Sequence, residues 1–146
     1  MVVGIDLIEA FKLAYNKLNE VPEKVKMKKS LLKVLKNFSY FVDDFVWDKI
    51  NDISNLQTKI SNIASELRIV LVESEDYLSE QTIKDIRSVC GNLEAAANIE
   101  VFGDSYNKNP KGDQLKNMIA HSKEKVDSNI LNLEKELKLL EGGSAL

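Results

Sequence analysis

Apolar residues recur at helical spacing along nearly the whole chain, and this periodicity limits the fold more than any other feature. The most apolar part is the segment from about residue 25 to residue 46. At about 100° per residue, its apolar side chains cover an arc of roughly 200°, about twice the width expected of a surface helix. The arc consists of Val25, Met27, Leu31, Leu32, Val34, Leu35, Phe38, Phe41, Val42, Phe45 and Val46. A helix with this much apolar surface must contact at least two neighbours or a partner, so we expect it at the centre of the core.

A shorter helix is expected to precede this segment. Its apolar stripe consists of Leu7, Ile8, Phe11, Ala14, Tyr15 and Leu18. Asn19 and Glu20 then lead to Pro22, a residue that favours the first turn of a new helix. The sequence therefore predicts a helix boundary close to Pro22.

Polar and capping residues predict the next boundaries. Asp, Asn and Ser cluster between residues 48 and 55, and they favour a break at about residue 51. The apolar series nevertheless continues through this cluster, so one long helix over residues 22–76 stays open as an alternative. With the break, the third helix ends at about Glu75, and Ser79 is the expected N-cap of the fourth.

The last helix is expected to follow a long loop. Residues 101–112 are rich in turn-forming types, and Asp113 can cap the helix that comes after them. Gly142 and Gly143 are expected to end that helix. Residues 142–146 are interpreted as a flexible tail or a remnant of cloning.

Together these segments predict an all-α fold with strand content close to none. The expected architecture is an antiparallel, up-and-down four-helix bundle with an additional shorter N-terminal helix. The chain of 146 residues is the length of one domain, so we predict a single domain over residues 1–141.

Charge and composition narrow the function. Twenty basic and 23 acidic residues leave a net charge of −3, which excludes a chain-wide electrostatic footprint for nucleic acid. The single cysteine, Cys90, cannot form an internal disulfide and lies on an apolar stripe, where we expect it to be buried. No secretory signal is legible, and no apolar run approaches the about 20 residues that span a bilayer. These features predict a cytoplasmic protein.

The titratable residues form no recognisable catalytic or metal-binding pattern. The chain has one histidine, His121, whereas di-iron and histidine-rich zinc sites require several. The glycines are isolated and follow no strand, so they do not form a phosphate-binding loop. We therefore expect a protein that is not an enzyme and that has no cofactor, no metal and no small-molecule substrate.

His121 lies at mid-helix, and helical periodicity places it away from the apolar stripe, towards solvent. The run Ala120-His121-Ser122 resembles the phosphorylated motif of histidine phosphotransfer domains, which are also helical bundles. This resemblance implies a phosphoryl acceptor at His121. The sequence departs from the family pattern where Glu124 and Lys125 stand in place of its lysine and glycine.

One flank of the wide apolar arc is formed by Phe41, Phe45, Val34 and Met27. Two neighbouring helices can bury the middle of the arc, but covering both flanks requires additional apolar surface from another segment. We expect the first helix to supply this surface by folding over the second helix as an internal lid. A second chain is the alternative cover.

The opposite face of the same helix carries a basic stripe of Lys26, Lys29, Lys33 and Lys36, with Trp47 farther along that face. These observations predict a non-enzymatic module that acts through protein–protein interaction, in an adaptor, regulatory or scaffold role. Its expected partner is another protein or a second copy. The alternative is a membrane-engaging bundle that uses the apolar N-terminal helix and the basic stripe. Phosphotransfer at His121 is the second alternative.

Overall fold

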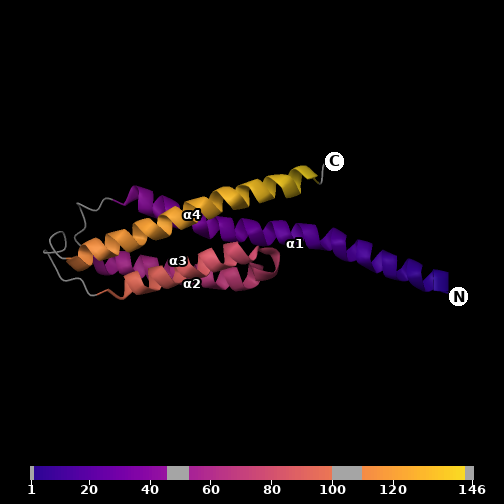
Figure 1. The fold of residues 1–146 in the computed structure, drawn as a ribbon, viewed down its shortest axis with the longest axis horizontal. Helices are drawn as coiled ribbons and strands as arrows, with labels where there is room; N and C mark the ends of the chain where they lie inside the picture. Colours follow the sequence, from indigo (N-terminus) through magenta and orange to yellow (C-terminus); the bar gives the residue numbers. More distant parts are fainter. Residues whose placement is uncertain (1, 46–52, 100–109, 144–146) are drawn as a thin grey trace.

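The chain is all-helical in a computed structural model (Figure 1). The structure describes the backbone of residues 2–45, 53–99 and 110–143, and the side chains of residues 21–45, 55–99 and 113–141. No strand occurs in those backbone segments, as the periodicity predicted. The elements are α1 (Val2–Asp44), α2 (Ile53–Ser74), the short 3-10 helix η2 (Glu75–Tyr77), α3 (Glu80–Ala97) and α4 (Pro110–Gly143).

The four long helices pack against one another. Helix α1 contacts both α2 and α4, and α3 contacts the same two helices. Figure 1 shows that α1 ends, α2 begins, α3 ends and α4 begins at the same end of the molecule. The core is a single cluster of buried apolar side chains from all four helices. It includes Leu31, Leu35, Phe38, Ile60, Leu67, Ile86, Leu93, Leu115, Ile119 and Leu133.

The predicted helix boundary at Pro22 is wrong, because α1 runs without a break from Val2 to Asp44 with Pro22 inside it. A proline inside a helix removes one backbone hydrogen bond and crowds the preceding turn. Pro22 is exposed, so water can bind the backbone carbonyl that loses its partner. The additional shorter N-terminal helix is therefore the first part of α1.

The continuity of α1 also excludes the internal lid. Residues 2–21 extend the axis of the helix that they were expected to cover, so they cannot fold back onto it. Figure 1 shows the N-terminal part of α1 projecting past the ends of α2, α3 and α4, and no other described helix runs beside that part. The flank of the apolar arc is therefore not covered by a preceding helix.

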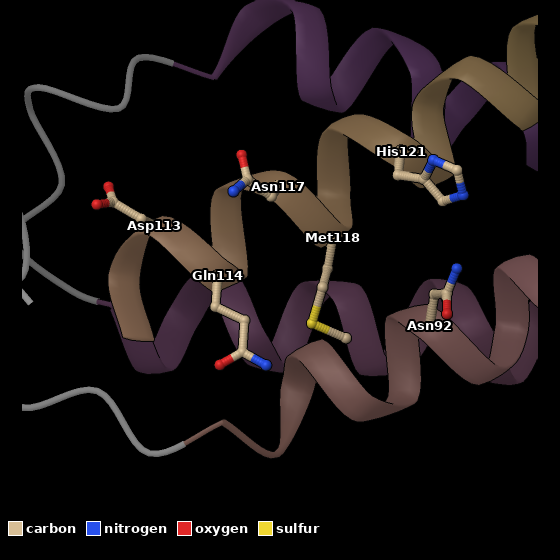
Figure 2. A pocket seen from close by; sticks show the side chains of 6 residues that line it. All are labelled: Asn92, Asp113, Gln114, Asn117, Met118 and His121. Carbon is tan, nitrogen blue, oxygen red and sulfur yellow. The ribbon is translucent and has the colours of Figure 1, made fainter. Parts of the chain in front are cut away.

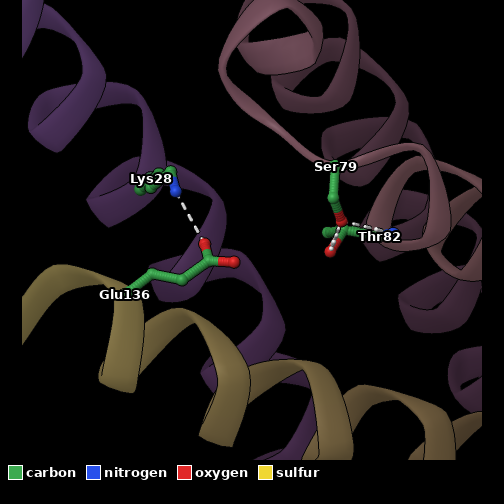
Figure 3. Close-up of polar contacts among 4 residues, drawn as sticks. All are labelled: Lys28, Ser79, Thr82 and Glu136. Atoms are coloured by element: carbon green, nitrogen blue, oxygen red, sulfur yellow. Dashed lines mark hydrogen bonds and ion pairs between the residues drawn. The ribbon is translucent and has the colours of Figure 1, made fainter. Parts of the chain in front are cut away.

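Two of the other predicted boundaries agree with the structure. Helix α2 ends at Ser74, close to the expected Glu75, and Ser79 caps α3. Separate helices α1 and α2 exclude one long helix over residues 22–76, although the break near residue 51 lies outside the described residues. Figure 3 shows Ser79 beside Thr82, whose backbone N–H donates to Ser79 Oγ at 3.2 Å.

The predicted start of the last helix at Asp113 is wrong, because α4 begins at Pro110 and holds Asp113 in its first turn. Proline is well suited to the first helical position, where its missing N–H would have no intrahelical partner. The carboxylate of Asp113 instead lies close to the positive end of the helix dipole. Helix α4 ends at Gly143, close to the end that the two glycines predicted. The predicted tail is wrong for Gly142 and Gly143, which belong to α4, and its residues 144–146 lie outside the described residues.

Among the residues that the structure describes, no helix is both long enough and apolar enough to cross a membrane.

Replacing Ser79 by Ala is expected to lower the free energy of unfolding by about 1 kcal/mol, because the N–H of Thr82 loses its acceptor at the start of α3. Ser65, which is exposed within α2, provides the matched control. Ser65→Ala should leave stability unchanged or raise it slightly, since alanine has the higher helix propensity. Chemical denaturation measures both variants. Equal stabilities for the two would contradict the capping role of Ser79.

Candidate interaction surface

A row of polar contacts joins α1 to α4 along their length. Its members are Asp43–Lys123 (3.1 Å), Ser39–Asp127 (2.6 Å), Lys36–Glu134 (3.1 Å), Lys28–Glu136 (2.6 Å) and Lys29–Glu141 (2.8 Å). Partners near the end of α1 lie early in α4, and partners near its middle lie late in α4. We call this set the α1–α4 polar row. It fixes the alignment of the two helices by charge as well as by apolar packing.

The polar row contains half of the predicted basic stripe. Lys29 and Lys36 are bound to glutamates of α4, so their charges are partly neutralised within the chain. Lys26 and Lys33 are exposed, and neither makes an ion pair with another described residue. The stripe is therefore divided between intramolecular ion pairs and exposed charge.

Lys28 is the most deeply placed cation of the row. Its side chain is only 6% exposed, and its ammonium contacts the carboxylate of Glu136, which is 39% exposed (Figure 3). The sequence analysis missed Lys28. The spacing of the sequence does indicate that Lys28 is buried, since Lys28 precedes Leu31 and Leu35 at the three-and-four spacing that marks the core face.

A second polar group lies farther along the row. The ammonium of Lys123 contacts both Asp127 (2.6 Å) and Asp43 (3.1 Å), and hydrogen bonds to these carboxylates raise the pKa of Lys123. Partial burial of Asp127 favours its neutral form, but hydrogen bonds from Lys123 and Ser39 outweigh that effect. The pKa of Asp127 is therefore lowered from its ordinary value of 3.8. Lys123 and Asp127 therefore both keep their charges at neutral pH.

One face of α1 carries a shallow depression where Lys26 and Lys33 are exposed. It is lined by Pro22, Val25, Lys26, Lys29, Ser30 and Lys33. Pro22 is exposed and Val25 is half-buried, so the surface between the lysines is apolar. Apolar surface with a rim of positive charge is suited to a partner that is itself apolar and acidic.

The predicted apolar flank is mostly packed against this chain's own core. Val34 is buried, and the half-buried Phe41 and Phe45 contact the core cluster. The two phenyl rings lie 5.5 Å apart between centroids, and Lys59 places its ammonium 5.8 Å from the Phe41 ring. Met27 is half-buried, and Trp47 lies outside the described residues. The flank therefore offers less free apolar surface than the sequence alone indicated.

His121 is exposed on α4, where the sequence analysis placed it. It lines a pocket of about 450 Å³ together with Asn92, Asp113, Gln114, Asn117 and Met118. Figure 2 shows Asn92 of α3 facing His121 across this pocket, with Met118 between the two helices. Glu124 is exposed one helical turn later. The six residues that line this open pocket include three amides and one carboxylate, and none of them is a lysine or an arginine.

Cys90 is buried, as its place on an apolar stripe predicted. Burial raises the pKa of its thiol to about 11, so the reactive thiolate is scarce at neutral pH. Within the described part of the chain, no three His, Cys, Asp or Glu side chains gather as a metal site would require. Cys90 is part of the buried core cluster.

Large apolar side chains are exposed on two other helices. Ile69 and Val72 of α2 and Leu131 and Leu139 of α4 are each at least 60% exposed. Single exposed apolar residues are common on protein surfaces, and only a contiguous patch indicates a contact site. These residues form one pair on each helix, so they do not define such a patch.

Glu136→Gln is expected to lower the free energy of unfolding by about 1–2 kcal/mol, because it leaves the Lys28 ammonium buried without an opposite charge. The same substitution made in a Lys28→Met chain should cost almost nothing, since no buried charge remains. A double-mutant cycle by chemical denaturation measures the coupling. Equal costs of Glu136→Gln in the two backgrounds would refute a stabilising Lys28–Glu136 pair.

Asp127→Asn is expected to cost about 0.5–1 kcal/mol at neutral pH, a modest value because the Asp127 side chain is 42% exposed. The lowered pKa means that ionised Asp127 stabilises the fold above its ordinary pKa of 3.8. This contribution is lost as pH falls through the folded-state pKa. The difference between wild type and variant should therefore shrink in acid.

Denaturation at a series of pH values measures that difference. Asp44→Asn is the matched control, because exposed Asp44 lies at the end of α1, where a negative charge is not stabilising. A difference between wild type and Asp127→Asn that persists unchanged below the pKa of the carboxylate would refute the assignment.

No family model matches the chain, and the comparisons with curated proteins and with solved structures found no match. The function is therefore inferred from the chain's own residues.

Proposed function

We propose that this chain is a non-enzymatic module that acts through protein–protein interaction, and that the N-terminal part of α1 carries the contact surface. The observation behind this proposal is the single helix from Val2 to Asp44. Its second half packs with α2 and α4, whereas its first part projects past the other described helices (Figure 1). A helical extension on a packed core is a suitable device for binding a partner.

The sequence of the extension supports the same proposal. Six apolar residues between Leu7 and Leu18 share one face of a helix at the period of 3.6 residues. Apolar surface of this extent in water is unfavourable, and a helix face of this kind commonly binds a groove or another helix. The internal lid was the intramolecular cover that we expected, and the continuity of α1 removes it. A partner molecule is the remaining cover.

For the rest of the chain we propose an antiparallel, up-and-down four-helix bundle that anchors the extension. The order of contacts in the α1–α4 polar row supports opposite directions for these two helices, since Asp43 contacts Lys123 and Lys29 contacts Glu141. The short connection through η2 between α2 and α3 supports opposite directions for that pair. In this arrangement the bundle supplies stability and α1 supplies the contact.

Two other proposals have less support. A membrane-engaging role would draw on the basic stripe, but Lys29 and Lys36 are already bound to glutamates of α4. Phosphotransfer would use His121, which is exposed as that function needs, but Glu124 repels a phosphoryl group from the next turn. Each of these alternatives has a distinct outcome in the experiment that follows.

Cross-linking of the full chain in an extract of its host tests the interaction. Lys12 and Lys17 are native amine handles in the projecting part of α1. We expect intermolecular cross-links from these lysines, to another protein or to a second copy, and we expect Phe11→Lys to abolish them. Asn16→Lys is the matched control, because residue 16 lies off the apolar stripe, and it should keep the cross-links.

Three results would overturn the proposal. The first is the absence of intermolecular cross-links that depend on Phe11. The second is co-sedimentation of the monomeric chain with anionic vesicles, lost in Phe11→Lys, which would favour the membrane role. The third is acid-labile phosphate that His121→Ala removes, which would favour phosphotransfer.

A further inference from the structure

We propose that the lysine-rimmed depression on α1 binds the outer face of α2 of a second copy of this chain. This contact goes beyond the proposed function, because it uses surfaces other than the apolar stripe of residues 7–18. Both surfaces consist of side chains that the structure describes, over residues 22–33 of α1 and residues 66–73 of α2.

The outer face of α2 combines apolar and acidic side chains. Ile69 is 60% exposed and Val72 is 73% exposed. Glu66 and Glu73 are exposed beside them, and neither glutamate makes an ion pair with another described residue. At about 100° per residue, these four side chains fall within an arc of roughly 120°, and we call them the acidic ridge of α2. The two apolar side chains alone are too few for a contact patch, but the glutamates give the ridge a charge that a partner can recognise.

The depression on α1 has a similar composition with the opposite charge. Pro22 and Val25 supply its apolar part, and the exposed Lys26 and Lys33 supply ammonium groups without an ion-pair partner among the described residues. The ridge and the depression therefore each place two apolar side chains beside two like charges. Because the charges have opposite signs on the two surfaces, the surfaces attract each other.

The two charged pairs also have the same spacing. Lys26 and Lys33 are seven residues apart on α1, and Glu66 and Glu73 are seven residues apart on α2. Seven residues correspond to about two turns, or about 10 Å along a helix. Both lysines can therefore contact both glutamates at the same time.

The rotation of each helix favours opposite directions for the two helices. On α1, Val25 lies about 90° around the helix from the lysine pair, and on α2, Val72 lies about 110° from the glutamate pair in the same rotational sense. Two helix faces with the same sense match only when the helices run in opposite directions. Helices that run in the same direction would place the valine of each copy against the charges of the other.

The antiparallel register brings the apolar side chains together as well. Pairing Lys26 with Glu73 aligns the other lysine with the other glutamate, because the spacings are equal. In that register Val72 lies two residues from the level of Val25, or about 3 Å along the axis. The valine of the ridge therefore enters the depression while both ion pairs form.

A contact between unlike surfaces has consequences for assembly. When one ridge binds one depression, the pair still has a free ridge and a free depression, so association can continue head to tail. Both surfaces are small, so we expect weak, reversible association that requires a high protein concentration.

Sedimentation velocity of the full chain over a concentration series tests the contact. We expect association that added salt weakens, since the charged pairs are exposed to solvent and are screened. Lys33→Glu should raise the dissociation constant at least about fivefold, because it places two negative charges side by side. Lys84→Glu is the matched control, since Lys84 is exposed on α3, and it should leave the constant within about twofold.

A mixing experiment tests whether the ridge and the depression meet each other. The chain with Lys26→Glu and Lys33→Glu keeps the ridge, and the chain with Glu66→Lys and Glu73→Lys keeps the depression. Each variant should stay monomeric alone, because like charges then face like charges. An equimolar mixture should associate again, because contacts between the two variants join unlike charges. Circular dichroism should show both variants folded, since all four positions are exposed.

The outcomes separate this contact from the proposed function. A wild-type chain that stays monomeric at every concentration overturns the contact, and so does a mixture of the two folded variants that stays monomeric. Neither result affects the interaction role, which uses residues 7–18. Association that Phe11→Lys abolishes would place the interface on the projecting part of α1 and would also overturn the contact. Intact association without Phe11-dependent cross-links overturns the proposed function instead.

Discussion

The wide apolar arc of α1 is the constraint on which the rest of the structure depends. Leu31, Leu35 and Phe38 have no exposed surface, and burying them requires apolar side chains from more than one helix. Helices α2 and α4 both contact α1, and α3 completes the packing by contacting α2 and α4. The burial of each large apolar side chain is worth about 1.5–3 kcal/mol, so this arc dominates the position of every other helix.

Polar contacts between α1 and α4 then fix the alignment of these two helices along their axes, which apolar packing alone does not determine. The α1–α4 polar row runs from Asp43 to Lys28. In this row, glutamates of α4 bind Lys29 and Lys36, two lysines of the basic stripe that the sequence analysis considered as a contact face. Among the side chains of α1 that the structure describes, the contacts of the row begin at Lys28 and the buried apolar core begins at Leu31. A helix that is anchored at one end and projects at the other can bind a partner without disturbing the core. The proposed interaction role rests on this division of α1.

Much of the fold is predictable from local chemistry. The helical period, the cap at Ser79 and the end of α4 at Gly143 depend on neighbouring residues, and a sequence displays such neighbours directly. The burial of Cys90 and the exposure of His121 follow equally from the position of each residue relative to an apolar stripe. The start of α4 at Pro110 was harder to predict, because both proline and aspartate favour the start of a helix. The sequence alone does not show whether the helix begins at Pro110 or at Asp113.

The sequence by itself determined which segments are helical and which faces are apolar, because both depend on spacing within one helix. Only the tertiary structure decided that Pro22 lies inside α1, since a proline can begin a helix or lie within one, where it removes a hydrogen bond and crowds the preceding turn. It also decided that Lys28 is paired with Glu136, a residue 108 positions away. Contacts over such separations depend on how whole helices align, and no local pattern records that alignment.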